Sequence, residues 1–330
     1  MSSDPLFPTD SLRDSGIQGV CPKACPGSRP GGFCGLRIAP ECLRINAHGT
    51  VRVGLSATPE AWFEFLTALG TALTFTRNPV AVLGCLGASP RMDNWNDPVL
   101  PLAGGALMSP NLGEYARLWA FRVRTSAGPA LGLEIEDVAG VPFQRVYLTG
   151  GAGRERFEEF VVQHQTPPGE AGIWFSPNQA SSARRRSLLA ARIPWLLQRR
   201  SHRGSPVRSL TRHHLAKLLE AIVRGRFPVR TMIYTSALIE GAVWIPGSEG
   251  QRGRSLGADR WLLRSERTVM QLDPIGIGSA WLWSGPCSCC GEVRWSIEIG
   301  DRSDGLALAV LAGHERLESE WRDLVSKVVQ

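Results

Sequence analysis

Apolar and polar residues alternate in two distant stretches of the chain that share one build. GLEIEDVAGVPFQRVYL, from Gly132 to Leu148, and SIEIGDRSDGLALAVLA, from Ser296 to Ala312, each contain two apolar runs separated by a segment with Asp and Gly. A period of two is typical of a β-strand, and Asp and Gly between two such runs are typical of a turn. Each stretch therefore predicts a β-hairpin.

The correspondence continues beyond each hairpin with apolar residues at helical spacing. These positions are Phe157, Phe160 and Val161 in the first copy and Trp321, Leu324 and Val325, at the same offset, in the second. Spacings of three and four residues place side chains on one face of an α-helix. An echo that persists over about 30 residues indicates an internal duplication.

A looser echo lies upstream. Ala61 to Gly84 and Leu215 to Trp244 each read as a helix, a short turn and a strand. Each half is then a helix, a set of antiparallel strands and a closing helix. The predicted fold class is α+β, with two similar halves that are each a large antiparallel sheet with packed helices.

Composition divides the chain into four segments. We expect a Cys/Pro/Gly-rich N-terminal tail at 1–40, a first half at 41–165, a basic Pro/Ser/Arg-rich connector at 166–209 and a second half at 210–330. The connector is expected to be irregular apart from a short helix around Ser187 to Leu197.

The bulk composition is that of a soluble globular protein. The chain has 330 residues, of which 43% are hydrophobic and 20% charged. The N-terminus has no apolar core, and no uncharged apolar run reaches the length of about 18 residues that a membrane helix needs. We therefore expect a cytoplasmic protein without membrane insertion and with reduced thiols.

Positive charge is concentrated in the connector. The formal net charge is +7, from 37 Lys+Arg against 30 Asp+Glu, and much of the excess lies between Ser182 and Gly204. Such a segment is either a solvated linker or a surface that binds nucleic acid or another anionic partner.

Four short motifs, in this order, resemble the HemS-type heme-trafficking and hemin-degrading family. They are LTFTRNPVAV, FQRVYLT, IGSAWLW and EWRDLV. The resemblance covers about 40–165 and 205–328. It implies a cytoplasmic protein that binds heme between its halves for trafficking, or that supports heme degradation and iron release, with a heme oxygenase or a reductant as the partner.

The resemblance also implies an axial histidine at the start of the second-half helix, in a pattern like V-H-x-F-F-x-L-L. Matching the paired leucines to Leu218 and Leu219 places this iron ligand at His213 in TRHHLAKLLEAI. On a helical wheel His213 lies opposite the leucine face, whereas His214 lies on the flank and is the second candidate. Neutral imidazole is a good ligand for heme iron.

The sequence departs from the family at two cationic positions. The family carries one arginine on a first-half strand and another after the second-half S-W strand, where this chain has Ser109 and Ser284. Serine cannot act as a permanent cation. Arg77, Arg117 and Arg122 are the neighbouring residues that could supply the charge.

Tryptophan is abundant, with 11 residues against three tyrosines. Trp119 and Trp281 fall on expected strands, where they line either the core or the walls of a heme cleft. We find no acid–base pair or nucleophile pattern, so catalysis is left open. An enzymatic member would be a heme-degrading oxidoreductase in which the cofactor carries the oxygen chemistry.

The eight cysteines suggest a different chemistry. Zinc or another soft metal could bind the tail set, although that set lacks the two close pairs of structural zinc sites. A turn with three thiols suits a soft metal or an intramolecular disulfide, although its Gly and Pro residues already explain a turn. The tail set is Cys21, Cys25, Cys34 and Cys42, and the turn set is Cys287, Cys289 and Cys290. Two Cys-Pro dipeptides in the tail also resemble heme-regulatory motifs. Cys85 is expected to be a buried small hydrophobe.

Two further functions therefore remain beside heme binding. One is an interaction or regulatory protein that keeps the fold and uses the connector for binding. The other is a thiol metal-handling protein.

Overall fold

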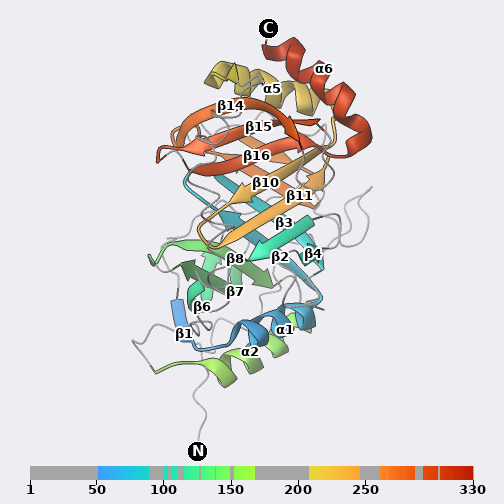
Figure 1. Cartoon of the computed structure of the whole chain (residues 1–330). Coiled ribbons are helices and arrows are strands. Elements are labelled where there is room, and N and C mark those ends of the chain that lie inside the picture. The colour runs from blue at the N-terminus through green and yellow to red at the C-terminus, as the bar shows by residue number, and fades with distance from the viewer. Residues whose placement is uncertain are drawn as a thin grey trace, which may run out of the picture.

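The chain folds around two large antiparallel sheets with helices at both ends of the molecule (Figure 1). The computed structural model describes residues 51–88, 100–102, 106–110, 115–125, 128–137, 139–148, 152–167, 208–245, 261–265, 267–286, 293–303 and 305–329. The α+β class with two antiparallel sheets is as the sequence predicts.

The strand order in each sheet is as follows. The first sheet runs β1 (Val51–Leu55), β6 (Tyr115–Thr125), β7 (Gly128–Asp137), β8 (Pro142–Leu148), β2 (Thr71–Arg77), β3 (Ala81–Ala88), β13 (Thr268–Leu272) and β12 (Trp261–Arg264). The second runs β4 (Leu100–Leu102), β5 (Ala106–Pro110), β11 (Leu238–Trp244), β10 (Val229–Tyr234), β16 (Leu306–Ala312), β15 (Val293–Asp301), β14 (Ile277–Pro286) and β9 (Arg208–Ser209).

Two helices pack against each sheet, and the two pairs lie at opposite ends of the molecule. They are α1 (Pro59–Leu69) and α2 (Ala152–His164) at one end, and α5 (Arg212–Gly225) and α6 (Glu318–Val329) at the other (Figure 1). A 3₁₀ turn at Glu315–Leu317 leads into α6. No helix in the described part of the chain is long and apolar enough to cross a bilayer.

The two predicted hairpins are confirmed as β7–β8 and β15–β16. Their turns share one hydrogen-bond pattern, because the first Asp of each turn accepts two backbone N–H groups at its Oδ1. Asp137 does so from Ala139 and Val141, both at 2.9 Å. Asp301 does so from Ser303 at 2.8 Å and Gly305 at 2.9 Å. Such Asp side chains stabilise turns, so the duplication extends to the chemistry of the turn.

The predicted closing helices are also confirmed, and their equivalent positions are buried alike. Phe157 and Val161 of α2 are 0% exposed, as are Trp321 and Val325 of α6. Burying one large apolar side chain contributes about 1.5–3 kcal/mol. The apolar positions of the echo are therefore the ones that attach each helix to its sheet.

The single strand predicted after each first helix is wrong, because each of these stretches is a hairpin, β2–β3 and β10–β11. Both turns are short and polar, with Asn-Pro at Asn78 and Thr-Ser at Thr235, and neither contains Gly. Without Gly these interruptions do not stand out from the polar positions of a strand, although Asn-Pro favours a turn. The turns are formed by Asn78 and Thr235, whose side-chain oxygens each accept two backbone N–H groups.

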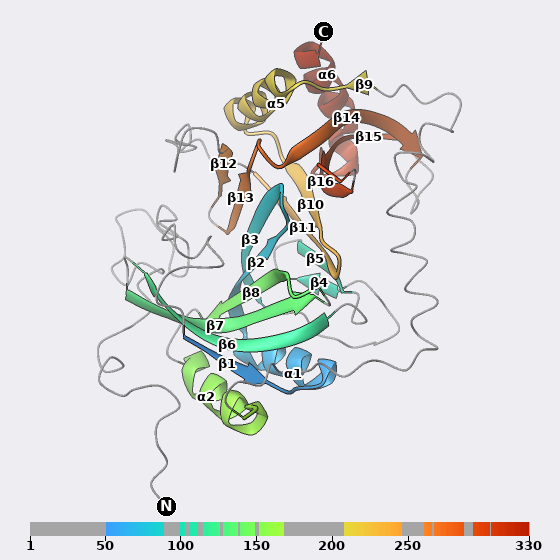
Figure 2. The same cartoon turned by 90° about the vertical axis from the view of Figure 1, so that its left-hand side faces the viewer.

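The two halves exchange a hairpin. The β4–β5 hairpin of the first half pairs through β5 with β11, and the β12–β13 hairpin of the second half pairs through β13 with β3 (Figure 2). Each sheet is thus completed by strands from the other half. The sequence echo does not indicate this exchange.

Polar contacts join the halves where β2 and β3 lie beside β10 and β11 (Figures 1 and 2). The Asn78 side-chain amide donates to the carbonyl oxygens of Tyr234 and Ala307, both at 2.7 Å. The Ser236 hydroxyl donates to the Asp137 carboxylate at 2.6 Å. Turn residues of both halves therefore also fix the junction.

Candidate functional site

The histidine pair lies on the first turn of α5, and its surroundings follow from the local sequence. Thr211 caps the helix, because its hydroxyl accepts the His214 backbone N–H at 3.2 Å. In return the Thr211 backbone N–H donates to His214 Nδ1, also at 3.2 Å. This reciprocal arrangement is a capping box in which histidine takes the place of the usual Glu or Gln.

The cap gives the two imidazoles different chemistry. Because His214 Nδ1 accepts a hydrogen bond, the proton of its neutral ring lies on Nε2, so iron ligation by His214 would disturb either the tautomer or the cap. His213 is exposed and forms no hydrogen bond with the described residues; its ring centre lies 6.5 Å from that of His214. His213 is thus the imidazole whose nitrogens are available to a metal.

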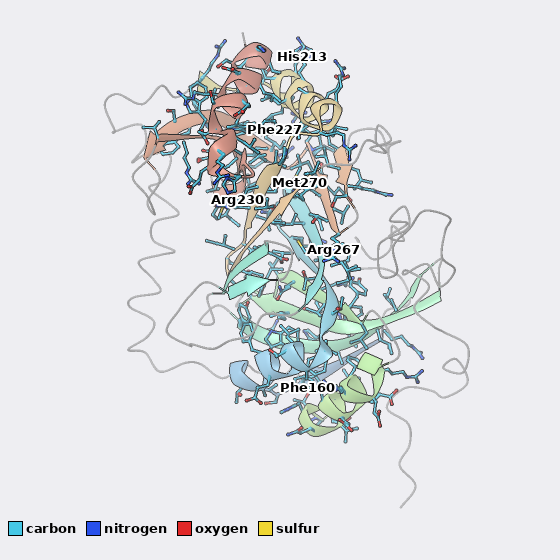
Figure 3. All side chains as sticks on the ribbon, turned by 90° about the vertical axis from the view of Figure 1, so that its right-hand side faces the viewer. Phe160, His213, Phe227, Arg230, Arg267 and Met270 are labelled. Atoms are coloured by element: carbon cyan, nitrogen blue, oxygen red, sulfur yellow. The ribbon has the colours of Figure 1, made fainter. Side chains whose placement is uncertain are left out.

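The helix also directs His213 away from the core, as its wheel predicts. Leu215, Leu218 and Ile222 are buried against the second sheet. Figure 3 shows His213 on α5 at the helical end of the second half, whereas Arg267 lies near the centre of the molecule. The described structure therefore places His213 on an outer surface and not at the junction of the halves.

Three cations accompany His213 along the chain. Arg208 of β9, Arg212 and Lys217 are exposed, and none forms an ion pair within the described structure. Lys217 follows His213 by one helical turn, which places both side chains on the same side of α5. This side of the helix start combines an available imidazole with positive charge.

Arg117 and Trp119 belong to a different environment, on the face of the first sheet opposite α1 and α2. Glu134, which is 0% exposed, pairs with both Arg52 and Arg145. Arg117 pairs with Glu136 at 3.6 Å and is partly exposed, and the Arg52 guanidinium lies 5.6 Å from the Trp119 ring centre.

The contacts of Arg117 and Trp119 within this network give both residues a structural role. Burial lowers the pKa of Arg52, while the charge of Glu136 acts in the opposite direction. The network compensates the charges that the sheet buries. Arg117 already forms an ion pair with Glu136, so its charge is compensated in the absence of any ligand.

Trp281 is the internal counterpart of Trp119. Trp119 lies directly opposite Glu134 in the β6–β7 pairing, and Trp281 lies directly opposite Glu298 in the β14–β15 pairing. On β14 Trp281 alternates with Ala280 and Leu282, which belong to the core beneath α5. Trp281 and α5 are therefore on opposite faces of the second sheet, and the structure does not bring Trp281 and His213 together.

The remaining predicted residues are dispersed. Arg77 is half-buried at the end of β2, and Arg122 is half-buried on β6. Ser109 lies on β5, opposite Ile239 of the other half, and Ser284 is buried on β14, opposite Trp295. Arg77, Arg122 and Ser284 therefore lie on strands of the two sheets and not on α5 with His213.

The cysteine proposals and most of the connector lie outside the described residues. This applies to the tail, to residues 168–207 of the basic connector and to Cys287, Cys289 and Cys290, which fall between the paired strands β14 and β15. Among the residues that the structure describes, no group of three or more His, Cys, Asp or Glu side chains could hold a metal ion. Cys85 is buried and free, as expected.

The sequence reading missed a buried carboxyl between the halves. Glu240 on β11 is 0% exposed, and it accepts hydrogen bonds from Thr74, at 3.0 Å, and from Thr76. Burial raises its pKa, whereas the hydrogen bonds from Thr76 and Thr74 act in the opposite direction. An acidic residue inside the apolar run ALIEGAVW was the available signal, because Glu is almost never fully buried without a partner.

Comparison with known proteins identifies the fold. No family model and no curated protein sequence matches the chain. Among solved structures, the heme-degrading enzyme ChuS of Escherichia coli O157:H7 superposes with a TM-score of 0.64 at 12% identity, covering 84% of this chain and 87% of ChuS. Holo-PhuS, a heme-binding protein from Pseudomonas aeruginosa, superposes with a TM-score of 0.62 at 18% identity, covering 83% and 86%. The chain thus has the duplicated α+β fold of the HemS-type proteins.

Proposed function

We propose that this chain is a cytoplasmic heme-binding protein that carries heme and transfers it to a partner, with His213 as the axial ligand of the iron. The observation that carries the proposal is that the two histidines at the start of α5 differ in their hydrogen bonds. His214 is held in the capping box, while His213 is exposed and has both ring nitrogens available. That this chain has the fold of a heme-binding and a heme-degrading protein supports the same ligand.

The cations near His213 suit the other end of the ligand. Heme carries two propionates, and guanidinium and ammonium groups bind carboxylates. We propose that Arg208, Arg212 and Lys217 supply this charge, because Ser109 and Ser284 cannot and because Arg117 is already paired with Glu136.

The position of His213 favours transfer. An axial ligand on an exposed helix start is accessible to a second protein, such as a heme oxygenase or a protein that supplies reductant. Bound heme would supply any oxygen chemistry itself, and the chain would contribute ligation and charge.

The test is a hemin titration followed by the Soret band, with the wild-type protein, His213→Ala and the matched neighbour variant His214→Ala. We expect saturable one-to-one binding by the wild type and by His214→Ala. For His213→Ala we expect an affinity lower by about tenfold or more, or an altered Soret position. If His213→Ala binds hemin with the same affinity and the same Soret position as the wild type, the assignment of His213 as the ligand is wrong.

A variant that lacks residues 1–40 separates the two possible kinds of ligand. If His213 is the ligand, this truncation leaves the titration unchanged. If only the truncation abolishes binding, the tail thiols are the ligands, because thiolate also binds heme iron.

The nucleic-acid and thiol-metal functions stay predictions. Both depend on residues outside the described part of the chain. Loss of salt-sensitive DNA retention on neutralising the connector arginines would support the first. Metal content that depends on Cys287, Cys289 and Cys290 would support the second.

A further inference from the structure

The junction of the two halves contains a carboxyl group without a cationic partner. Glu240 extends from β11 of the second half to the hydroxyls of Thr74 and Thr76 on β2 of the first half. No Arg, Lys or His in the described structure forms an ion pair with it, in contrast to Glu134, which lies between two guanidinium groups. A buried carboxylate without a counter-charge is expensive, whereas a buried carboxylic acid is tolerated.

A second group at this junction has an unused hydrogen-bonding capacity. Gln144 on β8 is 2% exposed, and neither its amide oxygen nor its amide nitrogen has a partner in the described structure. It lies directly opposite Thr76 in the β8–β2 pairing, so both side chains project from the same face. Opposite Thr76, which donates to Glu240, there is thus an amide that can accept from a carboxylic acid or donate to a carboxylate.

The other titratable groups that face Glu240 stay neutral while it titrates. They are the Cys85 thiol on β3, which interacts with the carboxyl, and the Tyr115 phenol on β6. Burial first, and the Glu240 charge second, raise the pKa of both groups above their ordinary values. Glu240 is therefore the group of this cluster that changes charge first as pH rises.

We propose that Glu240 is a proton-dependent connection between the two halves: the neutral acid holds β11 against β2, and its ionisation loosens that contact. The hydroxyls of Thr74 and Thr76 donate to the carboxyl, and the unpartnered Gln144 amide lies on the same face of the sheet as Thr76. The inference does not depend on heme, because every residue in it belongs to the described junction.

The direction of the pH effect follows from linkage. Glu240 has a raised pKa in the fold, so the folded protein holds its proton at pH values at which the unfolded chain has released it. Stability from this group is complete below the ordinary carboxyl pKa and is lost as pH rises toward the pKa in the fold. The equilibrium constant for opening rises about tenfold for each pH unit in that window.

Two measurements on wild-type protein and Glu240→Gln test the proposal. Gln has nearly the shape of the neutral acid and does not titrate. Infrared spectra recorded as a function of pH should show a carboxylic acid in the wild type that ionises above the ordinary carboxyl range and that Glu240→Gln lacks. Amide exchange should show β2 and β11 opening more in the wild type than in Glu240→Gln at high pH, with the difference disappearing at low pH.

Glu298→Gln is the matched control, since Glu298 is also buried but accepts from Ser296 within its own half. It should keep the wild-type pH dependence at β2 and β11. The proposal is overturned if Glu240→Gln keeps the wild-type pH dependence, or if the spectra show Glu240 ionising in the ordinary carboxyl range. If Glu240→Gln is too unstable for exchange, the spectrum of Glu298→Gln decides the question, because an acid band that persists in it does not belong to Glu298.

Discussion

The two most deeply buried glutamates of the described structure, Glu134 and Glu240, have opposite electrostatic environments. In the first sheet Glu134 is compensated by Arg52 and Arg145, while Glu240 between the sheets has only neutral donors. Removing one member of a buried ion pair leaves the other charge uncompensated in a low-dielectric interior. The side chain opposite a buried carboxyl therefore determines whether it behaves as a fixed charge or as a proton carrier.

Glu134→Ala should be among the most destabilising substitutions in the first half. It removes the carboxylate that pairs with the buried Arg145 guanidinium, at a cost of about 3–5 kcal/mol in the free energy of unfolding. Urea denaturation measures this cost. Glu220→Ala, which breaks an exposed pair with Arg224, should change it by about 0.5 kcal/mol or less. Equal effects of the two substitutions would show that the network contributes no more than a surface pair.

At the scale of the element, the two halves cap equivalent helices in different ways. Thr58 begins α1 and accepts one N–H bond, from Ala61 at 3.2 Å. Thr211 begins α5 and takes part in a reciprocal box with His214. The duplication preserved the threonine, but only the second half added a histidine that completes the cap and leaves its neighbour, His213, available.

Thr211→Ala and Thr58→Ala should each lower the free energy of unfolding by about 1 kcal/mol, the usual value of an N-cap. Thermal unfolding measures both changes. Thr211→Ala removes the hydroxyl acceptor but keeps the backbone N–H that donates to His214 Nδ1, so its hemin titration should remain that of the wild type. A changed Soret band in Thr211→Ala would show that the hydroxyl, and not the backbone N–H, keeps the His214 ring from binding iron.

At the scale of the whole molecule, the exchanged hairpins make each sheet depend on both halves. Removing 208–329 would take β12 and β13 from the first sheet and expose the edge of β3. Exposed edges pair with other chains. The internal symmetry is therefore a record of duplication and does not divide the chain into two independent sheets.

Halves spanning 41–165 and 210–330 should not unfold cooperatively when produced separately. Circular dichroism melting tests this expectation. Mixing the two halves should restore a transition, because each sheet regains its missing hairpin. Separate halves that each melt sharply would show that hairpin exchange is dispensable for folding.

The sequence by itself determined the α+β class, the two repeat hairpins and the closing helices. Those features rest on local periodicity, with Asp137 and Asp301 forming turns from their own neighbours. The outward direction of His213 was also local, since Leu215 and Leu218 fix the buried face of α5. Features that depend on residues three or four positions apart can be predicted from the sequence alone.

Only the tertiary structure decided which side chains meet. Glu240 meets Thr76 across about half of the chain, and β13 pairs with β3 from the other half. The meeting of such distant residues depends on how the sheets are completed and packed, and no local period encodes it. Long-range packing therefore placed α5, which carries His213, and the Trp281 side chain on opposite faces of the second sheet. It also brought the carboxyl of Glu240 to the junction of the halves.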